Sequence, residues 1–200
     1  MKYTDTKKKI LNSALDFFSQ HGYSGASIRQ IARAVGVRES AIYNHYKSKG
    51  EIFLAILSSF KLRTIGKEIL SDDLLDEAIN PEKFLKKLAS RLIEHWNKPE
   101  ERKFIRVLLM EQFTLIGNKE LSTTYYLSEL RKICELIFKE MVNTRIIKPF
   151  DPSLLADEFT ASLFLIRTEH LSSDDQSNIN NVYESAIKHV EFFWEAIRAN

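Results

Sequence analysis

Residues 27–46 read SIRQIARAVGVRESAIYNHY, and this stretch decides the fold of the N-terminal quarter of the chain. Ser27 and Gln30 have the spacing of a capping box, in which the hydroxyl and the glutamine side chain satisfy backbone donors at a helix start. A short helix is therefore expected to begin at Ser27. Apolar residues at helical spacing form its inner face: Ile28, Ile31, Ala32 and Val35.

Gly36 follows this helix and supplies a backbone position at which positive φ costs little. Val37 is an apolar anchor, and a second short helix is expected from about Arg38 to His45. Two short helices joined by residues 34–37 form a helix-turn-helix.

Two further helices flank this motif. Apolar residues between Ile10 and Phe18 recur at helical spacing, and Gly22 is a natural helix stop. Ser48 begins the helix after the motif. We therefore predict an N-terminal three-helix domain over residues 1–48, followed by a connecting helix over residues 49–70.

The second helix of the motif carries polar residues on its outer face. A helix about 10–12 Å across fits the major groove of B-DNA, where base edges present distinguishable donors and acceptors. When Val37, Ile42 and Tyr46 turn inward, the opposite face is placed to read DNA. This face comprises Arg38, Glu39, Ser40, Tyr43 and Asn44.

The charge distribution favours the same interpretation. Residues 1–50 hold nine Lys or Arg against three Asp or Glu, a net charge of +6, whereas the remainder holds 20 against 24, a net charge of −4. A basic segment joined to a mildly acidic body suggests a polyanion-binding part and a part with another task.

The remainder, residues 71–200, is expected to form a larger helical domain. Asn80 and Pro81 read as the N-cap and first residue of a helix that ends at about Asn97, before Pro99. Further helices are expected at 100–116, 127–141, 152–171 and 179–199, with a polar loop at 172–178. About nine helices and no strand make the predicted fold all-α.

Composition excludes several classes of protein. Of the 200 residues, 44% are hydrophobic and 28% charged, which excludes disorder of the whole chain, and six Gly with four Pro are few for an all-β fold. The longest nearly apolar run, 159–166, is far shorter than the roughly 20 residues that span a bilayer. A single cysteine, Cys134, and no zinc-like Cys/His spacing predict a cytoplasmic protein without metal or cofactor.

Residues 6–57 closely resemble the DNA-binding domain of the TetR, or tetracycline-repressor, family of transcriptional regulators. The resemblance is carried by His21-Gly22-Tyr23, Ile31-Ala32, Gly36-Val37, Ile42-Tyr43, His45-Tyr46 and Lys47-Ser48-Lys49. Beyond this segment, only the length, the helix count and the helix start at Asp151-Pro152 agree with the family. The resemblance implies a transcriptional regulator that binds a double-stranded DNA operator.

The resemblance also implies roles for individual residues. In the family, the residues that match Arg29, Glu39, Ser40 and Tyr43 commonly approach bases, and those that match Ser27, Asn44, His45 and Lys49 commonly hold phosphates. Phosphate contacts supply salt-dependent affinity, whereas base contacts specify sequence.

Two residues depart from the family pattern. Arg38 stands where the family often has a Ser or Thr cap, so the second helix is expected to lack a side-chain acceptor at its start. Glu39 places a carboxylate against a polyanion, which is tolerable mainly if it accepts from a cytosine amine.

The helical body contains candidates for a ligand site. Its helices at 81–97, 100–116 and 125–141 are rich in large aromatic and flexible apolar side chains, with charged residues among them. Ordinary core packing, with the charges paired to other side chains, is the alternative. The candidate ligand-binding residues are Trp96, Arg106, Met110, Phe113, Tyr126 and Arg167.

Together these features predict a repressor that leaves a palindromic operator when a small-molecule effector binds. It would act as a homodimer through its last two helices, whose apolar stripes are wider than one neighbour can cover. The alternative is a DNA-bound adaptor or architectural protein whose body recruits a protein partner. An enzyme is disfavoured because no activated nucleophile, acid–base pair, glycine-rich phosphate loop or metal cluster is visible.

Overall fold

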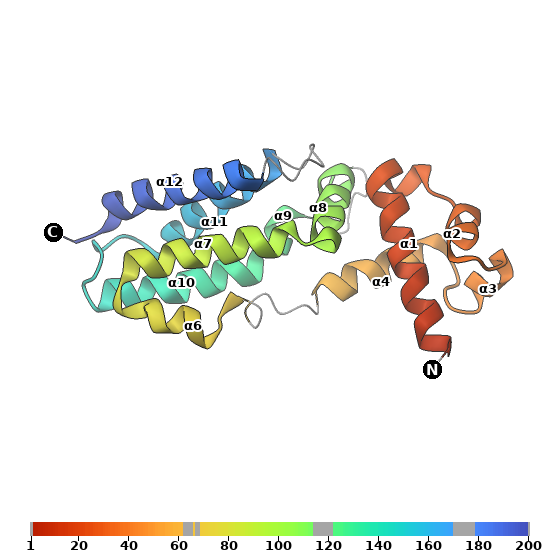
Figure 1. Cartoon of the computed structure of the whole chain (residues 1–200), viewed down its shortest axis with the longest axis horizontal. Coiled ribbons are helices and arrows are strands. Elements are labelled where there is room, and N and C mark those ends of the chain that lie inside the picture. The colour runs from red at the N-terminus through yellow and green to blue at the C-terminus, as the bar shows by residue number, and fades with distance from the viewer. Residues whose placement is uncertain (1, 62–65, 67–68, 114–121, 170–178, 200) are drawn as a thin grey trace. The chain divides into compact units, whose positions relative to one another are not determined.

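The fold is all-α, as the sequence predicts. The computed structural model describes residues 2–61, 66, 69–113, 122–169 and 179–199, which form eleven α-helices and one 3-10 helix (Figure 1). The sequence predicts only nine helices, because three short elements have too few residues to show the helical spacing of apolar side chains. Within the described ranges, β pairing is limited to one isolated bridge, between Ile147 and Arg198.

The chain divides into two compact units. The first unit comprises Met1–Arg63 and Pro99–Tyr126, and the second unit comprises Thr64–Lys98 and Leu127–Asn200. The segment Pro99–Tyr126, which we expected within the C-terminal body, thus packs with the N-terminal helices. The domain limits at residues 48 and 70 stay a prediction.

The first unit is built around one apolar core. Its helices are α1 (Lys2–Gly25), α2 (Ile28–Val35), α3 (Glu39–Tyr43), α4 (Lys49–Lys61), α8 (Pro99–Glu111) and α9 (Thr123–Tyr126). Buried residues from five of these helices meet in this core: Ile10, Phe18, Ile31, Ile42, Ile52, Ile56, Phe104 and Leu108. The ring of Phe60 on α4 stacks on Phe104 at a centroid distance of 4.0 Å. Helix α8 is therefore part of the core that supports α2 and α3.

Helix α1 is interrupted where the sequence indicates a stop. Gly22 has a φ of 71° and a ψ of 171°, which lie outside the helical region, and a further helical turn follows to Gly25. A side chain at position 22 would be strained by this φ and would meet Glu111, because an added Cβ would lie 2.9 Å from Glu111 Oε1.

The second unit is a bundle of long helices that run side by side (Figure 1). Its elements are α6 (Asp72–Leu75), the 3-10 helix η1 (Asp76–Ile79), α7 (Pro81–Asn97), α10 (Ser128–Asn143), α11 (Pro152–Glu169) and α12 (Ile179–Ile197). The rings of Phe138, Phe159 and Phe193 lie 5.6 to 5.7 Å apart and join three of the helices. This aromatic cluster is a point at which α10, α11 and α12 pack together.

N-terminal capping residues determine where two helices of the second unit begin. The Asn80 side chain accepts a hydrogen bond from Lys83 N at 3.1 Å, with Pro81 as the first helical residue, as predicted. Asp151 Oδ1 accepts from Ser153 N at 3.0 Å at the start of α11. These bonds satisfy backbone donors that a helix start leaves without a partner.

An arginine fixes the segment that precedes α7. Arg91 donates to Ile69 O at 3.0 Å and also to Ser71 Oγ and Asp73 Oδ2. Hydrogen bonds from Ser71 and Arg91 hold the pKa of Asp73 well below its usual range. This network attaches residues 69–73 to the middle of α7.

Some predicted boundaries differ from the structure. Helix α8 ends at Glu111, earlier than the expected residue 116, and two residues in a turn follow it. The connecting helix α4 is described to Lys61, so its predicted extension to residue 70 lies largely outside the described residues. The predicted loop at 172–178 also lies outside them. Over the described ranges, none of the helices is both long and apolar enough to cross a membrane.

We predict that Cys134 is unreactive in the folded protein. The thiol is buried, and burial raises its pKa to about 12, so the nucleophilic thiolate is scarce at pH 8. A thiol-specific disulfide reagent at pH 8 should therefore react about a hundredfold more slowly with the native chain than with the chain unfolded in guanidinium. Equal rates in the two states would show that the thiol is accessible and would contradict this placement.

Candidate nucleic-acid interface

Helix α2 begins with the predicted capping box. Ser27 has an extended backbone, and its N–H donates to Gln30 Oε1 at 2.8 Å. In return, Ser27 Oγ accepts from Gln30 N at 3.3 Å. These reciprocal bonds fix the direction in which α2 leaves the preceding turn.

The turn between α2 and α3 depends on one glycine. Gly36 has a φ of 77° in the left-handed region, and no atom would lie within 4 Å of an added Cβ. Glycine is therefore favoured here by its backbone conformation and not by crowding. Val37 N donates to Ala32 O at 3.0 Å, which closes the end of α2 and sets the start of α3.

Helix α3 presents the predicted polar face to solvent. Ile42 is fully buried and Tyr46 nearly so, and both anchor the segment in the first unit's core. Arg38 is the N-cap residue and makes no side-chain capping bond, as its departure from the family pattern predicts. The five residues expected to face DNA are all exposed: Arg38, Glu39, Ser40, Tyr43 and Asn44.

An ion pair joins the two helices of the motif on this exposed side. Arg29 Nε of α2 lies 4.0 Å from Glu39 Oε1 of α3. The pair is solvent-exposed, so it adds little to stability, but it gives the Glu39 carboxylate a cationic neighbour that offsets part of its repulsion from phosphates. Two residues that the resemblance assigns to base contacts are thus brought together.

The residues expected to hold phosphates occupy different environments. Ser27 Oγ lies 2.7 Å from Gln30 Oε1 within the capping box. Asn44 is exposed and His45 is half-buried, both directly after α3. All three lie at the ends of α2 or α3, which is where a helix-turn-helix meets the DNA backbone.

Lys49 has a structural role that the sequence does not reveal. Its ammonium donates to Tyr23 O at 2.7 Å and to Ala26 O at 2.8 Å, and it lies 4.4 Å from the centroid of the Tyr23 ring. These contacts attach the first residue of α4 to residues 23–26, which comprise the last residues of α1 and the connection to α2. We call residues 23–26 the link between α1 and α2. An ammonium has three N–H donors, so a phosphate contact is compatible with these two bonds.

The six candidate ligand-binding residues fall in two different units. Trp96 and Arg167 are buried in the second unit, where Trp96 packs edge-on against Phe164 and Arg167 donates to Asn97 Oδ1 at 3.2 Å. In the first unit, Tyr126 donates from its hydroxyl to Glu101 Oε2 at 3.0 Å. The others of this set in the first unit are Arg106, which is half-buried, and Met110 and Phe113, which are exposed.

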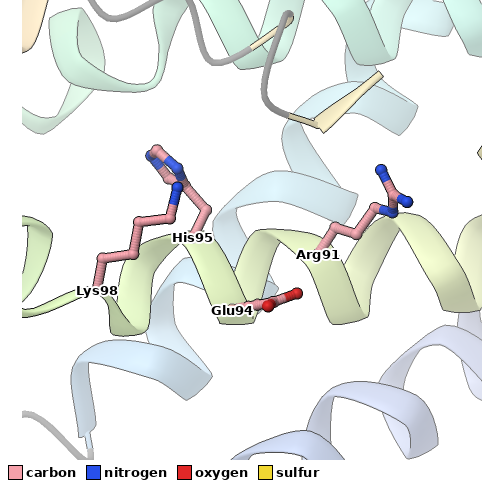
Figure 2. Close-up of a pocket in the computed structure, with 4 residues that line it drawn as sticks. All are labelled: Arg91, Glu94, His95 and Lys98. Carbon is pink, nitrogen blue, oxygen red and sulfur yellow. The ribbon is translucent and has the colours of Figure 1, made fainter. Parts of the chain in front are cut away.

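A small polar pocket lies along one face of α7 (Figure 2). It has a volume of about 150 Å³ and is lined by Arg91, Glu94, His95 and Lys98. None of these is a candidate ligand residue, and the volume is below the roughly 300 Å³ at which ordinary small-molecule sites begin. In the part of the chain that the structure describes, no three His, Cys, Asp or Glu residues are grouped to hold a metal ion.

Known proteins resemble this chain most clearly in its N-terminal segment. Residues 10–56 match the family model for bacterial regulatory proteins of the tetR family. The transcriptional repressor AcnR of Corynebacterium glutamicum is 33% identical over 78 residues, which cover 39% of this chain and 40% of AcnR. The chain thus matches less than half the length of that relative.

Solved structures resemble the whole chain. A protein of Mesorhizobium loti that is described as a TetR-family transcriptional regulator superposes with a TM-score of 0.72 over the full length of both chains, at 24% identity. NalD, described as the secondary repressor of the MexAB-OprM multidrug efflux pump in Pseudomonas aeruginosa, gives a TM-score of 0.68 at 20% identity, covering 98% of this chain and 99% of NalD. At these identities the likeness shows a common fold.

The capping box, the left-handed glycine and the exposed face of α3 lie within the segment that the family model matches, and the rest of the chain has the fold of solved TetR-family structures. The chain is thus similar to the bacterial regulatory proteins of the tetR family in residues 10–56, and it shares the fold of a solved structure described as a TetR-family regulator.

Proposed function

We propose that the protein is a transcriptional repressor that binds a palindromic DNA operator through α2 and α3. The observation that carries this proposal is the polar face of α3, which is exposed while Ile42 and Tyr46 anchor the helix from behind. A short helix held in this way can enter the major groove without losing its support. This function belongs in the cytoplasm, where bacterial DNA is found.

The candidate DNA-contact residues divide into two proposed roles. Base contacts come from Arg29, Arg38, Glu39, Ser40 and Tyr43, and phosphate contacts from Ser27, Asn44, His45 and Lys49. Tyr43 is 52% exposed at the end of α3, where its ring can reach a base and the thymine methyl group. We propose residues 1–48 as the DNA-binding domain, 49–70 as the connecting helix and 71–200 as the ligand-binding and dimerisation domain.

Replacing Tyr43 should remove sequence discrimination. An operator would first be selected from a pool of random duplexes with the parent protein. Tyr43→Ala should then bind that operator with an affinity close to its affinity for a scrambled duplex, a loss of about tenfold or more in discrimination. Fluorescence anisotropy with both duplexes measures the ratio.

Lys47→Ala serves as the matched control, because Lys47 is an exposed residue outside the predicted base contacts. It should weaken binding to both duplexes equally, if at all. If Tyr43→Ala kept the parental discrimination, the proposed recognition helix would be misplaced.

We further propose that the protein is a homodimer through α11 and α12. Leu154 and Leu165 lie three turns apart on one face of α11 and are 52% and 59% exposed, and Phe192 of α12 is 75% exposed. Exposed large apolar side chains of this kind are typical of an interface with another chain. A two-fold axis would bring two such helix pairs together and also place two α3 helices on a palindrome.

Light scattering at micromolar concentration should give about twice the 23.3 kDa chain mass. Leu165→Glu should shift the protein toward the monomer, because each charge would be buried in the interface. Leu136→Glu is the matched control, since Leu136 is 67% exposed on α10, outside the proposed interface. A parent protein that is monomeric at these concentrations would rule out the dimer.

A small-molecule effector is proposed to release the protein from DNA. NalD, which shares the fold, is described as repressing a multidrug efflux pump, and this suggests an apolar or amphipathic effector. An effector can act only through a difference in its affinity for the DNA-bound and free conformations. Of the candidate contacts, Trp96 and Arg167 belong to the second unit, and Arg106, Met110, Phe113 and Tyr126 belong to the first.

A screen of amphipathic compounds against the protein–operator complex tests this proposal. A true effector should lower operator affinity by about fivefold or more, within the range of ordinary allosteric coupling. Arg167→Met should weaken the response of a compound that bears a negative charge more than that of a neutral one. If no compound changed DNA binding and a protein partner co-purified with the chain, a DNA-bound adaptor would be the better description.

A further inference from the structure

A buried carboxylate from α8 reaches the break in α1. Glu111 is only 6% exposed, and its Oε1 accepts a hydrogen bond from Tyr23 N at 2.8 Å. The non-helical backbone of Gly22 directs this N–H away from the helical ladder and toward α8. Position 22 leaves no room for a side chain there, because an added Cβ would lie 2.9 Å from the same oxygen.

Tyr23, which Glu111 holds by its backbone, is in turn the centre of a second set of contacts. Its ring packs edge-on against Phe53 of α4 at 5.0 Å and in a tilted arrangement against Phe18 of α1 at 5.7 Å. Its carbonyl oxygen accepts from Lys49 Nζ at 2.7 Å, and the same ammonium lies over the ring. Tyr23 therefore links α8 to the first residue of α4.

Lys49 extends these contacts to the start of α2. Its ammonium also donates to Ala26 O at 2.8 Å, and Ala26 directly precedes the N-cap residue Ser27. The start of α4 is itself fixed, because Ser48 Oγ accepts from Glu51 N at 3.1 Å and Glu51 Oε2 accepts from Lys47 N at 2.5 Å. A continuous series of polar contacts thus runs from Glu111 through Tyr23 and Lys49 to the helix-turn-helix.

We propose that Glu111 is a positioning residue for DNA recognition: by holding Tyr23 N–H, it fixes the link between α1 and α2 and so sets the orientation of the reading helices. Its bond to a backbone amide is charge-assisted and shielded from water, so its loss leaves a buried donor unsatisfied. The DNA-binding consequence rests on the proposed function, whereas the effect on residues 23–30 does not.

Two other contacts between α8 and the N-terminal helices lie away from the link between α1 and α2. Lys103 Nζ pairs with Asp16 Oδ1 at 2.5 Å, and Phe104 stacks on Phe60. These contacts hold α8 against α1 and α4 but do not touch the link between α1 and α2. They provide a comparison for the role of Glu111.

Two substitutions at position 111 separate the effect of the side chain's length from the effect of its charge. Glu111→Gln keeps an acceptor oxygen at the same reach without the charge, whereas Glu111→Asp keeps the charge but is one methylene shorter. Glu111→Ala removes both, and Glu111→Asp serves in its place if the alanine variant does not fold. Lys103→Met removes a polar contact between α8 and α1 and is the matched control.

Hydrogen exchange of the full chain is the first measurement. Glu111→Ala and Glu111→Asp should accelerate exchange at residues 23–30 by about tenfold or more, with Glu111→Gln and Lys103→Met close to the parent. Unchanged protection of residues 23–30 in a folded Glu111→Ala or Glu111→Asp variant would overturn the proposal, whatever the protein binds.

DNA binding is the second measurement, with the duplex selected by the parent and its scrambled counterpart. Glu111→Ala and Glu111→Asp should lose about tenfold in affinity for the selected duplex, and Glu111→Gln should restore it to within about threefold. Lost protection with unchanged DNA affinity would overturn the positioning role. A parent protein that selects no duplex would contradict the proposed function instead, and the exchange measurement would still decide whether Glu111 holds residues 23–30.

Discussion

The proposed recognition helix depends on burial, because α3 has only five residues and cannot be stable by itself. Ile42 and Tyr46 fix it to a core that α1, α2, α4 and α8 share. The exposed polar face of α3 is therefore a consequence of what the opposite face buries. Loss of this core would remove the proposed DNA-reading surface without changing any residue that is proposed to contact DNA.

The same core explains why α8 has more than one role. Its apolar residues Phe104, Val107 and Leu108 pack under the N-terminal helices, while Glu111 reaches the break in α1. Burying the carboxylate is costly, and its bond to Tyr23 N–H offsets that cost. The positive φ of Gly22, which glycine adopts readily, is what makes the amide available. A helix far along the chain thereby helps to define the start of α2.

Features that depend on neighbouring residues could be predicted from the sequence. The capping box of Ser27 and Gln30, the left-handed Gly36 and the Asn80 cap are local, and the structure confirms all three. Contacts between distant residues could not be predicted in this way. The bonds from Lys49 to the α1–α2 link and from Glu111 to Tyr23 join residues 23 to 88 positions apart, and no periodic pattern reveals such pairs. The candidate ligand residues show the same limit, since apolar patterning does not say which of two units each residue joins.

The central claim is that α2 and α3 together read DNA. Amide NMR spectra of the protein with and without a selected operator duplex test it most directly. We expect the largest shift changes at residues 27–49, centred on Tyr43, and much smaller ones under a scrambled duplex in moderate salt. Equal changes with both duplexes, or changes that avoid residues 27–49, would contradict this account.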